Sequence, residues 1–462
     1  MVETPRPEVL EALRAAKRIY RKNRTLTLVS HADADVWANK VFFAEQDGYL
    51  YGVIEQPRNG RGHHYQNIVR NPHVFFLIDR GVPDLFLQGE GQAEILGDVT
   101  ERPERHILFR RVPEAVIFAK FFPLLVFRIR PTHLYISDYS EEWKPRARVE
   151  VSDDLFRLFQ GPLKSSPRPW QAYWQAVRSF SFTVTIFAIL LGALLAPVVS
   201  WPLLLLALVG GLLAHAGTNV ISDYFDHRRG VDTWLTLGSS RVLLDELMQP
   251  RRLIAFGFLL LVLAAAVGVT LALLRGLPVL YLALAGGFLA AFYTSPPVGF
   301  KYRALGDAGV FLAFGPLMAL GSYYVQAQAW AWTPVLLSVP LGLLTVAILH
   351  GNNLRDMADD ARLGFKTVAA LLGFRGSGIY YASLVAGAYA FTVLAVALGR
   401  LSPWGLLVFL TAPLAWRNLD AAFHPRRVDF TFLDLVTARL HFRFGLLLVG
   451  AVALGRFLPV VP

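Results

Sequence analysis

Residues 219–232 read NVISDYFDHRRGVD and follow directly on a long apolar run. The stretch sets three carboxylates, Asp223, Asp226 and Asp232, beside the basic pair Arg228 and Arg229. An ionisable group at membrane depth is costly unless it faces a cavity, a partner or a metal ion. The stretch is therefore a candidate functional site, and the rest of the chain is best read in relation to it.

The composition is typical of a membrane protein. The chain has 462 residues, of which 54% are hydrophobic and only 17% are charged, and its mean hydropathy is +0.43. It contains no cysteine, so disulfides, thiolate metal sites and cysteine nucleophiles are excluded, and any metal must be held by oxygen or histidine. The net charge of +11 is spread between apolar runs rather than over one soluble face, so we expect no nucleic-acid partner.

From about residue 180 onward, the apolar runs are long enough to cross a bilayer, which takes roughly 20 helical residues. We expect about nine spans, so the fold class is an all-α multi-pass membrane helical bundle. The spans lie near residues 180–199, 201–221, 253–274, 277–293, 307–325, 333–350, 378–398, 402–416 and 442–460.

The charges in the loops predict the orientation of these spans. No cleaved signal peptide is evident in the first twenty residues, so we expect a cytoplasmic amino terminus in the cell membrane. The even-numbered loops are then cytoplasmic and carry most of the basic residues, whereas the opposite loops have little beyond Arg275 and Arg400. The stretch 219–232 falls on the cytoplasmic side.

A second polar cluster follows the run that ends near residue 350. It contains Asn352, Asn353, Arg355, Asp356 and Asp360, and its two aspartates are four residues apart, which places them on one helix face. Magnesium prefers oxygen ligands, usually one or two carboxylates together with substrate phosphate and water. We expect the two clusters to face each other across a polar chamber and to hold a diphosphate through Mg²⁺. The alternative is that these are ordinary mixed-charge loops.

A diphosphate also needs basic and amide partners, because its charge exceeds what metal ions alone offset. Residues in the same loops and clusters could supply them, and the candidates are Asn219, Arg228, Arg241, Lys301, Asn353, Arg355 and Lys366.

Residues 1–145 have the pattern of a soluble α+β domain. A helix is expected over residues 7–23, and short β-rich runs separated by turn residues suggest a small barrel. The runs cover residues 25–30, 41–43, 49–54, 74–79, 85–96 and 126–129. Residues 146–176 read as a linker and interfacial segment, in which Trp170, Tyr173 and Trp174 are placed as an aromatic belt would be.

Within this domain, residues 67–72 (NIVRNP), 89–91 (GEG) and 127–135 resemble the FMN-binding split barrel of the pyridoxamine-phosphate-oxidase-like group. The resemblance implies a cytosolic, flavin-reductase-like domain that holds FMN through Arg61, His64 and Asn67. In that group the position of His64 is commonly a basic residue that meets the flavin phosphate. The alternative is a barrel without a cofactor that serves in docking or regulation.

Residues 177–462 resemble the UbiA superfamily of intramembrane prenyltransferases, most closely the 1,4-dihydroxy-2-naphthoate polyprenyltransferases of menaquinone synthesis. The matching strings are residues 219–233, 238–250 (GSSRVLLDELMQP), 293–297 (YTSPP), 321–326 (GSYYVQ) and 352–367 (NNLRDMADDARLGFKT). The chain departs from the pattern at Ser222, where this branch usually has Asn, and over residues 298–303, which include Lys301.

The resemblance implies a magnesium-dependent transfer of a polyprenyl group. The catalytic residues would be Asp223, Asp226, Asp356 and Asp360, and these together with Asp232 would hold the metal. Mg²⁺ would act as a Lewis acid on the allylic diphosphate, and the aromatic ring would attack the resulting cation and, for dihydroxynaphthoate, lose carbon dioxide. The alternatives are another acceptor (hydroxybenzoate, homogentisate, chlorophyllide or glycerol phosphate), or a transporter or membrane-anchored flavin-binding protein.

Overall fold

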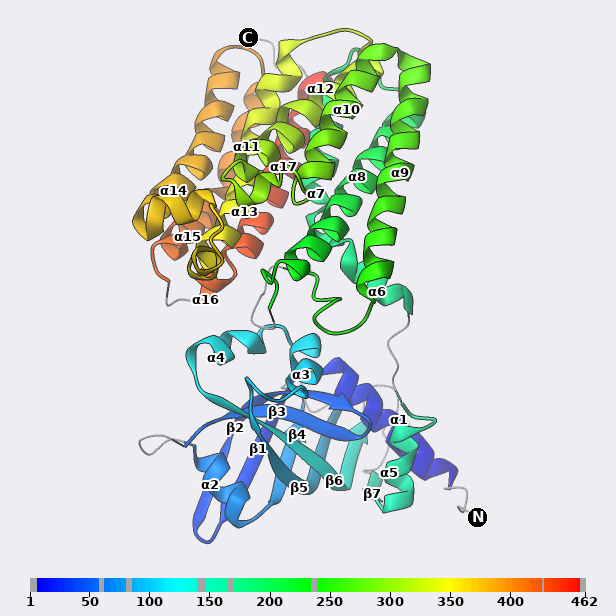
Figure 1. Cartoon of the computed structure of the whole chain (residues 1–462), viewed down its shortest axis with the longest axis vertical. Helices are drawn as coiled ribbons and strands as arrows, with labels where there is room; N and C mark the ends of the chain where they lie inside the picture. Colours follow the sequence, from blue (N-terminus) through cyan, green and yellow to red (C-terminus); the bar gives the residue numbers. More distant parts are fainter. Residues whose placement is uncertain are drawn as a thin grey trace. The chain divides into compact units, whose positions relative to one another are not determined.

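The structure is a computed structural model that describes residues 6–57, 62–79, 85–138, 147–164, 169–233, 239–425 and 428–457. The chain forms two compact units, of which the first runs to Arg168 and the second begins at Pro169. Figure 1 shows a strand-rich first unit and a helical second unit.

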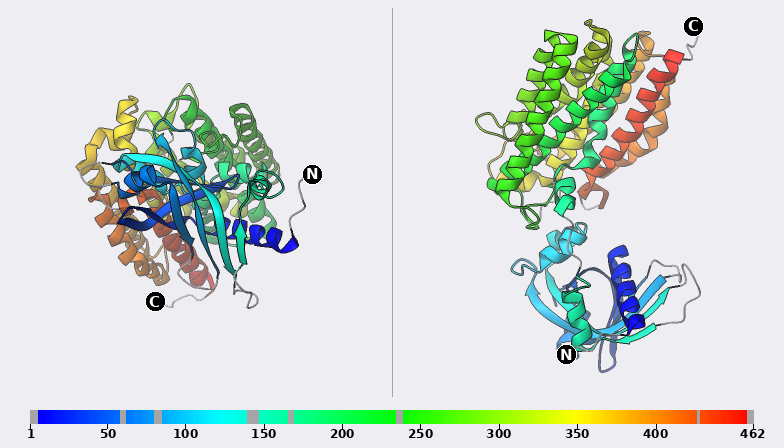
Figure 2. Two further views of the ribbon diagram at one scale, coloured as in Figure 1. Left: turned by 90° about the horizontal axis from the view of Figure 1, so that it is seen from below. Right: turned by 90° about the vertical axis from the view of Figure 1, so that its right-hand side faces the viewer.

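The first unit is an antiparallel barrel (Figures 1 and 2). The strand order is β3-β2-β1-β4-β5-β6-β7, and a further pairing of β3 with β6 closes the ring. The strands are β1 (Thr25–Ala32), β2 (Asp35–Gln46), β3 (Tyr49–Glu55), β4 (His73–Ile78), β5 (Leu85–Asp98), β6 (Leu124–Asp138) and β7 (Ala147–Glu150). The helices are α1 (Pro7–Lys22), α2 (His63–Arg70), α3 (Arg105–Arg111), α4 (Ala115–Phe121) and α5 (Asp153–Gln160).

Buried side chains alternate with more exposed ones along the strands, and the buried ones fill the barrel core. In β1 every second residue is buried, including Leu26 and Leu28, as expected for a strand with one face inward. Helix α1 contributes Leu13 and Ile19 to the same core. The predicted helix and the predicted barrel strands are therefore confirmed, with β1, β2 and β6 longer than expected.

One expectation for this unit is corrected. The expected linker 146–176 supplies β7 and α5 to the barrel, because Val149, Phe156 and Phe159 are buried in its core. Residues 63–70, which include His64 and Asn67, form α2.

The second unit is a bundle of helices that run side by side (Figures 1 and 2). They are α6 (Pro169–Ala176), α7 (Thr183–Leu195), α8 (Trp201–Arg228), α9 (Pro250–Arg275), α10 (Leu277–Phe292), α11 (Gly306–Leu312), α12 (Met318–Ala327), α13 (Trp332–Arg362), α14 (Val368–Ala397), α15 (Ala412–Ala422), α16 (Val428–Thr431) and α17 (Leu433–Phe457). Shorter 3₁₀ turns are η1 (Ser179–Ser181), η2 (Phe300–Tyr302) and η4 (Pro403–Thr411), and a π-helical turn, η3 (Ala313–Leu317), joins α11 to α12.

The number of long apolar helices is smaller than the nine spans expected. Six helices in the described ranges are long and apolar enough to cross a membrane, or seven if α6 and α7 form one span bent by 40°. All nine predicted runs fall on helices, but α10 has only 16 residues. The run 402–416 is divided between the 3₁₀ turn η4 and α15.

Close packing around α7 organises the bundle. Helix α7 packs against α12, α13 and α17. Gly192 of α7 touches the backbone of α12 so closely that a β-carbon there would collide with the carbonyl oxygen of Ala319. Small residues let transmembrane helices approach in this way. The two polar clusters lie at the ends of α8 and α13.

Candidate active site

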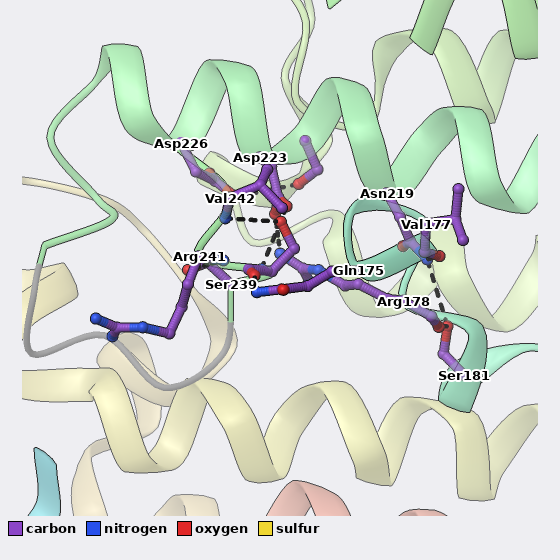
Figure 3. Close-up of polar contacts among 12 residues, drawn as sticks. Gln175, Val177, Arg178, Ser181, Asn219, Asp223, Asp226, Ser239, Arg241 and Val242 are labelled. Carbon is purple, nitrogen blue, oxygen red and sulfur yellow. Dashed lines mark hydrogen bonds and ion pairs between the residues drawn. The ribbon is translucent and has the colours of Figure 1, made fainter. Parts of the chain in front are cut away.

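Asp223 lies three residues before the buried Asp226 on the last turns of α8, and it is 2% exposed. It forms an ion pair with Arg178, which lies between α6 and η1 with a left-handed φ of 53° (Figure 3). The backbone N–H of Ser240 donates a 3.2 Å hydrogen bond to its other oxygen. Both oxygens of Asp223 are therefore engaged by donors from outside α8.

Asp226 accepts three hydrogen bonds. The Nζ of Lys301 lies 2.7 Å from its Oδ2, and the hydroxyl of Tyr302 donates to Oδ1 at 2.6 Å. The third donor is the hydroxyl of Ser222, 3.1 Å from Oδ2. Ser222, which stands where this family branch usually has Asn, thus places a hydroxyl donor beside the carboxylate of Asp226. Lys301 contacts Asp226 although residues 298–303 depart from the family pattern.

Burial and neighbouring charges shift the pKa values of two residues in this region. Burial, together with the charges of Asp226 and Asp223, raises the pKa of Asp232 well above its ordinary value. Burial alone would lower the pKa of Lys301, but the neighbouring Asp226 outweighs it and raises that pKa. An added cation near these carboxylates would offset their mutual repulsion. The donor set, oxygen from carboxylates, fits Mg²⁺.

The second cluster is organised by Arg355. Its guanidinium contacts Asp356 at 2.7 Å and Asp434 of α17 at 3.2 Å, and it also donates to the side-chain oxygen of Asn352. Asn353 and Asp360 are buried beside it, at 5% and 9% exposure. Arg355 is therefore the counter-ion of two carboxylates.

Tyr302 connects the first cluster to the segment that follows the second. Its hydroxyl binds Asp226, while its backbone carbonyl accepts the N–H of Lys366 at 3.3 Å and its ring lies 4.9 Å from that of Phe365. The guanidinium of Arg229 packs over the same ring, 4.0 Å from its centre. The segment after the second cluster and the end of α8 thus meet at one tyrosine.

The other proposed diphosphate partners lie in different surroundings. The side-chain amide of Asn219 donates to the carbonyl of Val177 and to Ser181. Arg241 is buried, pairs with Asp245 at 3.3 Å and extends away from Asp223 (Figure 3). Arg228 and Lys366 are exposed. Within the described residues, no three His, Asp or Glu side chains are close enough to share one metal ion.

Sequence reasoning missed Arg178, Tyr302 and Asp434. A lone arginine ahead of the first apolar run was the only signal for Arg178, and Tyr302 lies directly after Lys301. Asp434 begins the last long helix, far in sequence from Arg355, and nothing local marks it as a partner.

The predicted flavin residues lie in a buried network of the barrel. His64 is 4% exposed, with Nδ1 2.8 Å from the hydroxyl of Ser30 and Nε2 2.7 Å from the amide oxygen of Asn39. Asn67, 1% exposed, donates to the carbonyl of Ser30, and Arg61 lies outside the described residues. The contacts of His64 and Asn67 do not fit a flavin phosphate, because their polar atoms already bind the protein.

The second unit contains a segment that matches a known protein family. Residues 185–429 match the model of the UbiA prenyltransferase family. The chain is 34% identical over 298 residues to the UbiA prenyltransferase domain-containing protein 1 of Mus musculus, covering 62% of this chain and 86% of that protein.

Two solved structures resemble one unit each. A UbiA homologue from Archaeoglobus fulgidus, bound to DMAPP and Mg²⁺, is 13% identical and covers 60% of this chain and 99% of its own, with a TM-score of 0.43. A putative pyridoxamine 5'-phosphate oxidase from Listeria innocua is 22% identical and covers 28% of this chain and 97% of its own, with a TM-score of 0.21.

Proposed function

The chain belongs to the UbiA prenyltransferase family and is an enzyme of that family, and from this premise we propose that its acceptor is 1,4-dihydroxy-2-naphthoate in menaquinone biosynthesis. The donor is an allylic polyprenyl diphosphate. The observation that carries the prenyl-transfer part of the proposal is that each cluster holds carboxylates with a paired cation, and that Tyr302 joins Asp226 to the segment after the second cluster.

Magnesium would be held by the carboxylates of both clusters. The residues are Asp223, Asp226, Asp232, Asp356 and Asp360. When bound, the metal ion supplies Lewis-acid stabilisation of the departing diphosphate. The nearby charges of Asp226 and Asp223, which together with burial raise the pKa of Asp232, support this assignment.

The cations of the site would bind the diphosphate and hold it in place. Lys301 lies 2.7 Å from Asp226 and is held in position by that contact. Arg355 is fixed between Asp356 and Asp434, so its orientation is set before substrate arrives. Fixed cations stabilise developing negative charge without reorganising during the reaction. Arg228, Arg241 and Lys366 are further candidates, with Asn219 and Asn353 as amide donors.

The apolar bundle would keep water from the reacting carbon. The chain is a multi-pass membrane protein, and the core of its helical unit is packed with aliphatic and aromatic side chains such as Phe187, Leu344 and Phe444. An allylic cation exposed to water would be hydrolysed, so a dry site favours transfer to the acceptor. We further propose nine crossings, with α10 and the η4–α15 run as short ones, and cytoplasmic placement of the barrel and both clusters.

The test is an assay of radiolabelled prenyl diphosphate against a panel of acceptors, with and without Mg²⁺. We expect turnover with dihydroxynaphthoate that requires Mg²⁺ and is abolished by Asp223→Ala or Asp356→Ala. Asp420→Ala is the matched control, because Asp420 is a carboxylate of the same unit that pairs with His424. Turnover only with another acceptor would overturn the dihydroxynaphthoate proposal, and full activity of Asp223→Ala would favour a transporter or anchor.

Flavin binding by the barrel is a separate proposal, supported by the split-barrel resemblance and opposed by the engagement of His64 and Asn67. Its test is the visible flavin absorbance of the purified full-length protein. Colourless protein that takes up no added FMN would refute it.

A further inference from the structure

A buried acid–base pair lies in the bundle outside the two carboxylate clusters. Asp307 is in the first turn of α11 and His350 is on α13, and they are 5% and 0% exposed. The Oδ2 of Asp307 lies 3.6 Å from the Nδ1 of His350. In the described part of the chain, neither of these two atoms has a hydrogen-bond partner.

The contacts of His350 fix where its proton lies. Its Nε2 is 3.2 Å from the backbone carbonyl of Ser377. A carbonyl can only accept, so Nε2 carries a hydrogen, and a neutral ring then presents the lone pair of Nδ1 to Asp307. In that form two acceptors face each other 3.6 Å apart. A proton placed between them would complete a hydrogen bond between the two side chains.

The side chain of Tyr380 contacts this pair and is also partly exposed. The ring of Tyr380 on α14 packs edge-on against that of His350, with the ring centres 4.7 Å apart. Tyr380 is only half-buried, whereas Asp307 and His350 are buried. Tyr380 is therefore the member of the trio that an outside group can reach.

The pair adjoins the candidate active site. Gly306, which precedes Asp307, packs so closely that a β-carbon there would lie 3.3 Å from the Cα of Lys301 and 3.8 Å from the ring of Tyr293. The carbonyl of Tyr293 accepts the N–H of Lys301 at 2.9 Å, and Lys301 contacts Asp226. The first turn of α11 is therefore next to the segment that carries Lys301. His350 also precedes Asp356 by six residues on α13, a rise of roughly 9 Å along the helix axis.

We propose that Asp307 and His350, reached through Tyr380, form a proton relay for a phenolic acceptor, an inference that rests on the proposed prenyl transfer. The acceptor O–H bond breaks and its proton passes to the pair, while the freed electron pair drives the ring carbon to bond with the allylic carbon. The allylic C–O bond breaks, and diphosphate leaves with those electrons.

The relay then returns the proton. The first product is a ring ketone whose new tetrahedral carbon still bears hydrogen or carboxylate. That carbon loses H⁺ or carbon dioxide, and the ketone oxygen takes the proton back from the pair as the aromatic ring re-forms. Asp307 and His350 end the cycle as they began it, so the net reaction releases only diphosphate and H⁺ or carbon dioxide.

The experiment measures kcat and KM for prenyl diphosphate in full-length Asp307→Asn and His350→Gln, from neutral to alkaline pH. At neutral pH we expect kcat to fall roughly 100-fold, the scale of a lost general base, with KM changed less than about twofold because diphosphate contacts are intact. The loss should shrink as pH rises toward the acceptor phenol's own pKa of about 10, since an ionised acceptor needs no base. Tyr380→Phe should show a smaller loss with the same pH recovery.

Tyr381→Phe is the matched control, because it removes a buried hydroxyl that bonds to Thr437 and not to the pair. It should keep the parental pH profile. An equal loss at every pH, or no loss in any of the three variants, would refute the relay. Asp226→Ala separates the two proposals: if it stays active, the proposed function fails, and if it is inactive while Asp307→Asn lacks pH recovery, only the relay fails.

Discussion

The hydroxyl of Tyr302 donates a 2.6 Å hydrogen bond to the carboxylate of Asp226, while the backbone carbonyl of the same tyrosine accepts the N–H of Lys366. One residue therefore holds the end of α8 and the segment after α13 in register. Prenyl transfer needs both segments at one diphosphate, so this contact is the first place to test the site.

Tyr302→Phe should lower kcat/KM for prenyl diphosphate roughly 10- to 100-fold. It removes a hydrogen bond to a charged group, which is worth about 1.5–3 kcal/mol, but retains the ring that contacts Phe365 and Arg229. Steady-state kinetics at several Mg²⁺ concentrations provide the measurement. Tyr389→Phe, which removes a hydroxyl bound to Thr411, should have little effect, and an equal loss in both variants would argue against a specific role.

Arg178→Gln should destabilise the bundle, because it leaves the buried carboxylate of Asp223 without its cation. Breaking a buried ion pair by removing one partner costs about 3–5 kcal/mol. Adding Asp223→Asn should recover much of the lost stability without restoring activity, since the unpaired charge is gone. Thermal unfolding of the two single variants and the double variant measures the coupling. Additive losses would show that the two side chains do not act as a pair.

Gly192→Ala should loosen the contact between α7 and α12. Its methyl group would collide with the backbone carbonyl of Ala319, which cannot move without shifting the helix. We expect a loss of about 1–3 kcal/mol, the usual cost of overpacking. Gly321→Ala on α12 is the control, because a β-carbon there meets nothing within 4 Å. A Tm for Gly192→Ala equal to that of the control would contradict this packing.

The barrel should lose stability in acid through His64. Burial, followed by the nearby charge of His63, lowers the pKa of His64 from 6.5 to about 4. Between those values the unfolded chain binds a proton that the folded barrel does not, so this contribution is present above pH 6.5 and is lost as pH falls toward 4. The change is on the order of 3 kcal/mol, from about 1.4 kcal/mol for each pKa unit. Hydrogen exchange of the barrel in the full-length protein measures it, and His64→Gln should reduce the slope; an unchanged slope would exclude His64.

Much of this architecture was open to prediction from local pattern. The alternation in β1 and the helical spacing of α1 follow directly from residues that must face a core. The aspartates of α8 and α13 stood out because carboxylates rarely follow apolar runs without a function. These signals depend on residues close together in the sequence, so they can be recognised without the tertiary structure.

The ion-pair partners Arg178 and Asp434 could not be predicted from local sequence patterns. Arg178 precedes Asp223 by 45 residues, and Asp434 follows Arg355 by 79 positions, so only the packing of α6 and α7 against α8, and of α13 against α17, brings each pair together. The run 402–416 was predicted as one helix, but hydropathy does not distinguish the α-helix of α15 from the 3₁₀ turn η4 that precedes it. The hydrogen bonds of His64 could not be predicted either, because its partners Ser30 and Asn39 lie on strands far from it in sequence.

The ion pairs of Arg178 and Asp434 also determine where the chain can be shortened. The segment that matches the family model, residues 185–429, begins after Arg178 and ends before Asp434. A protein trimmed to that segment would keep the carboxylates of α8 and the guanidinium of α13 but lose a neutralising partner of each. Charge balance therefore requires a shortened chain to extend at least from Arg178 to Asp434.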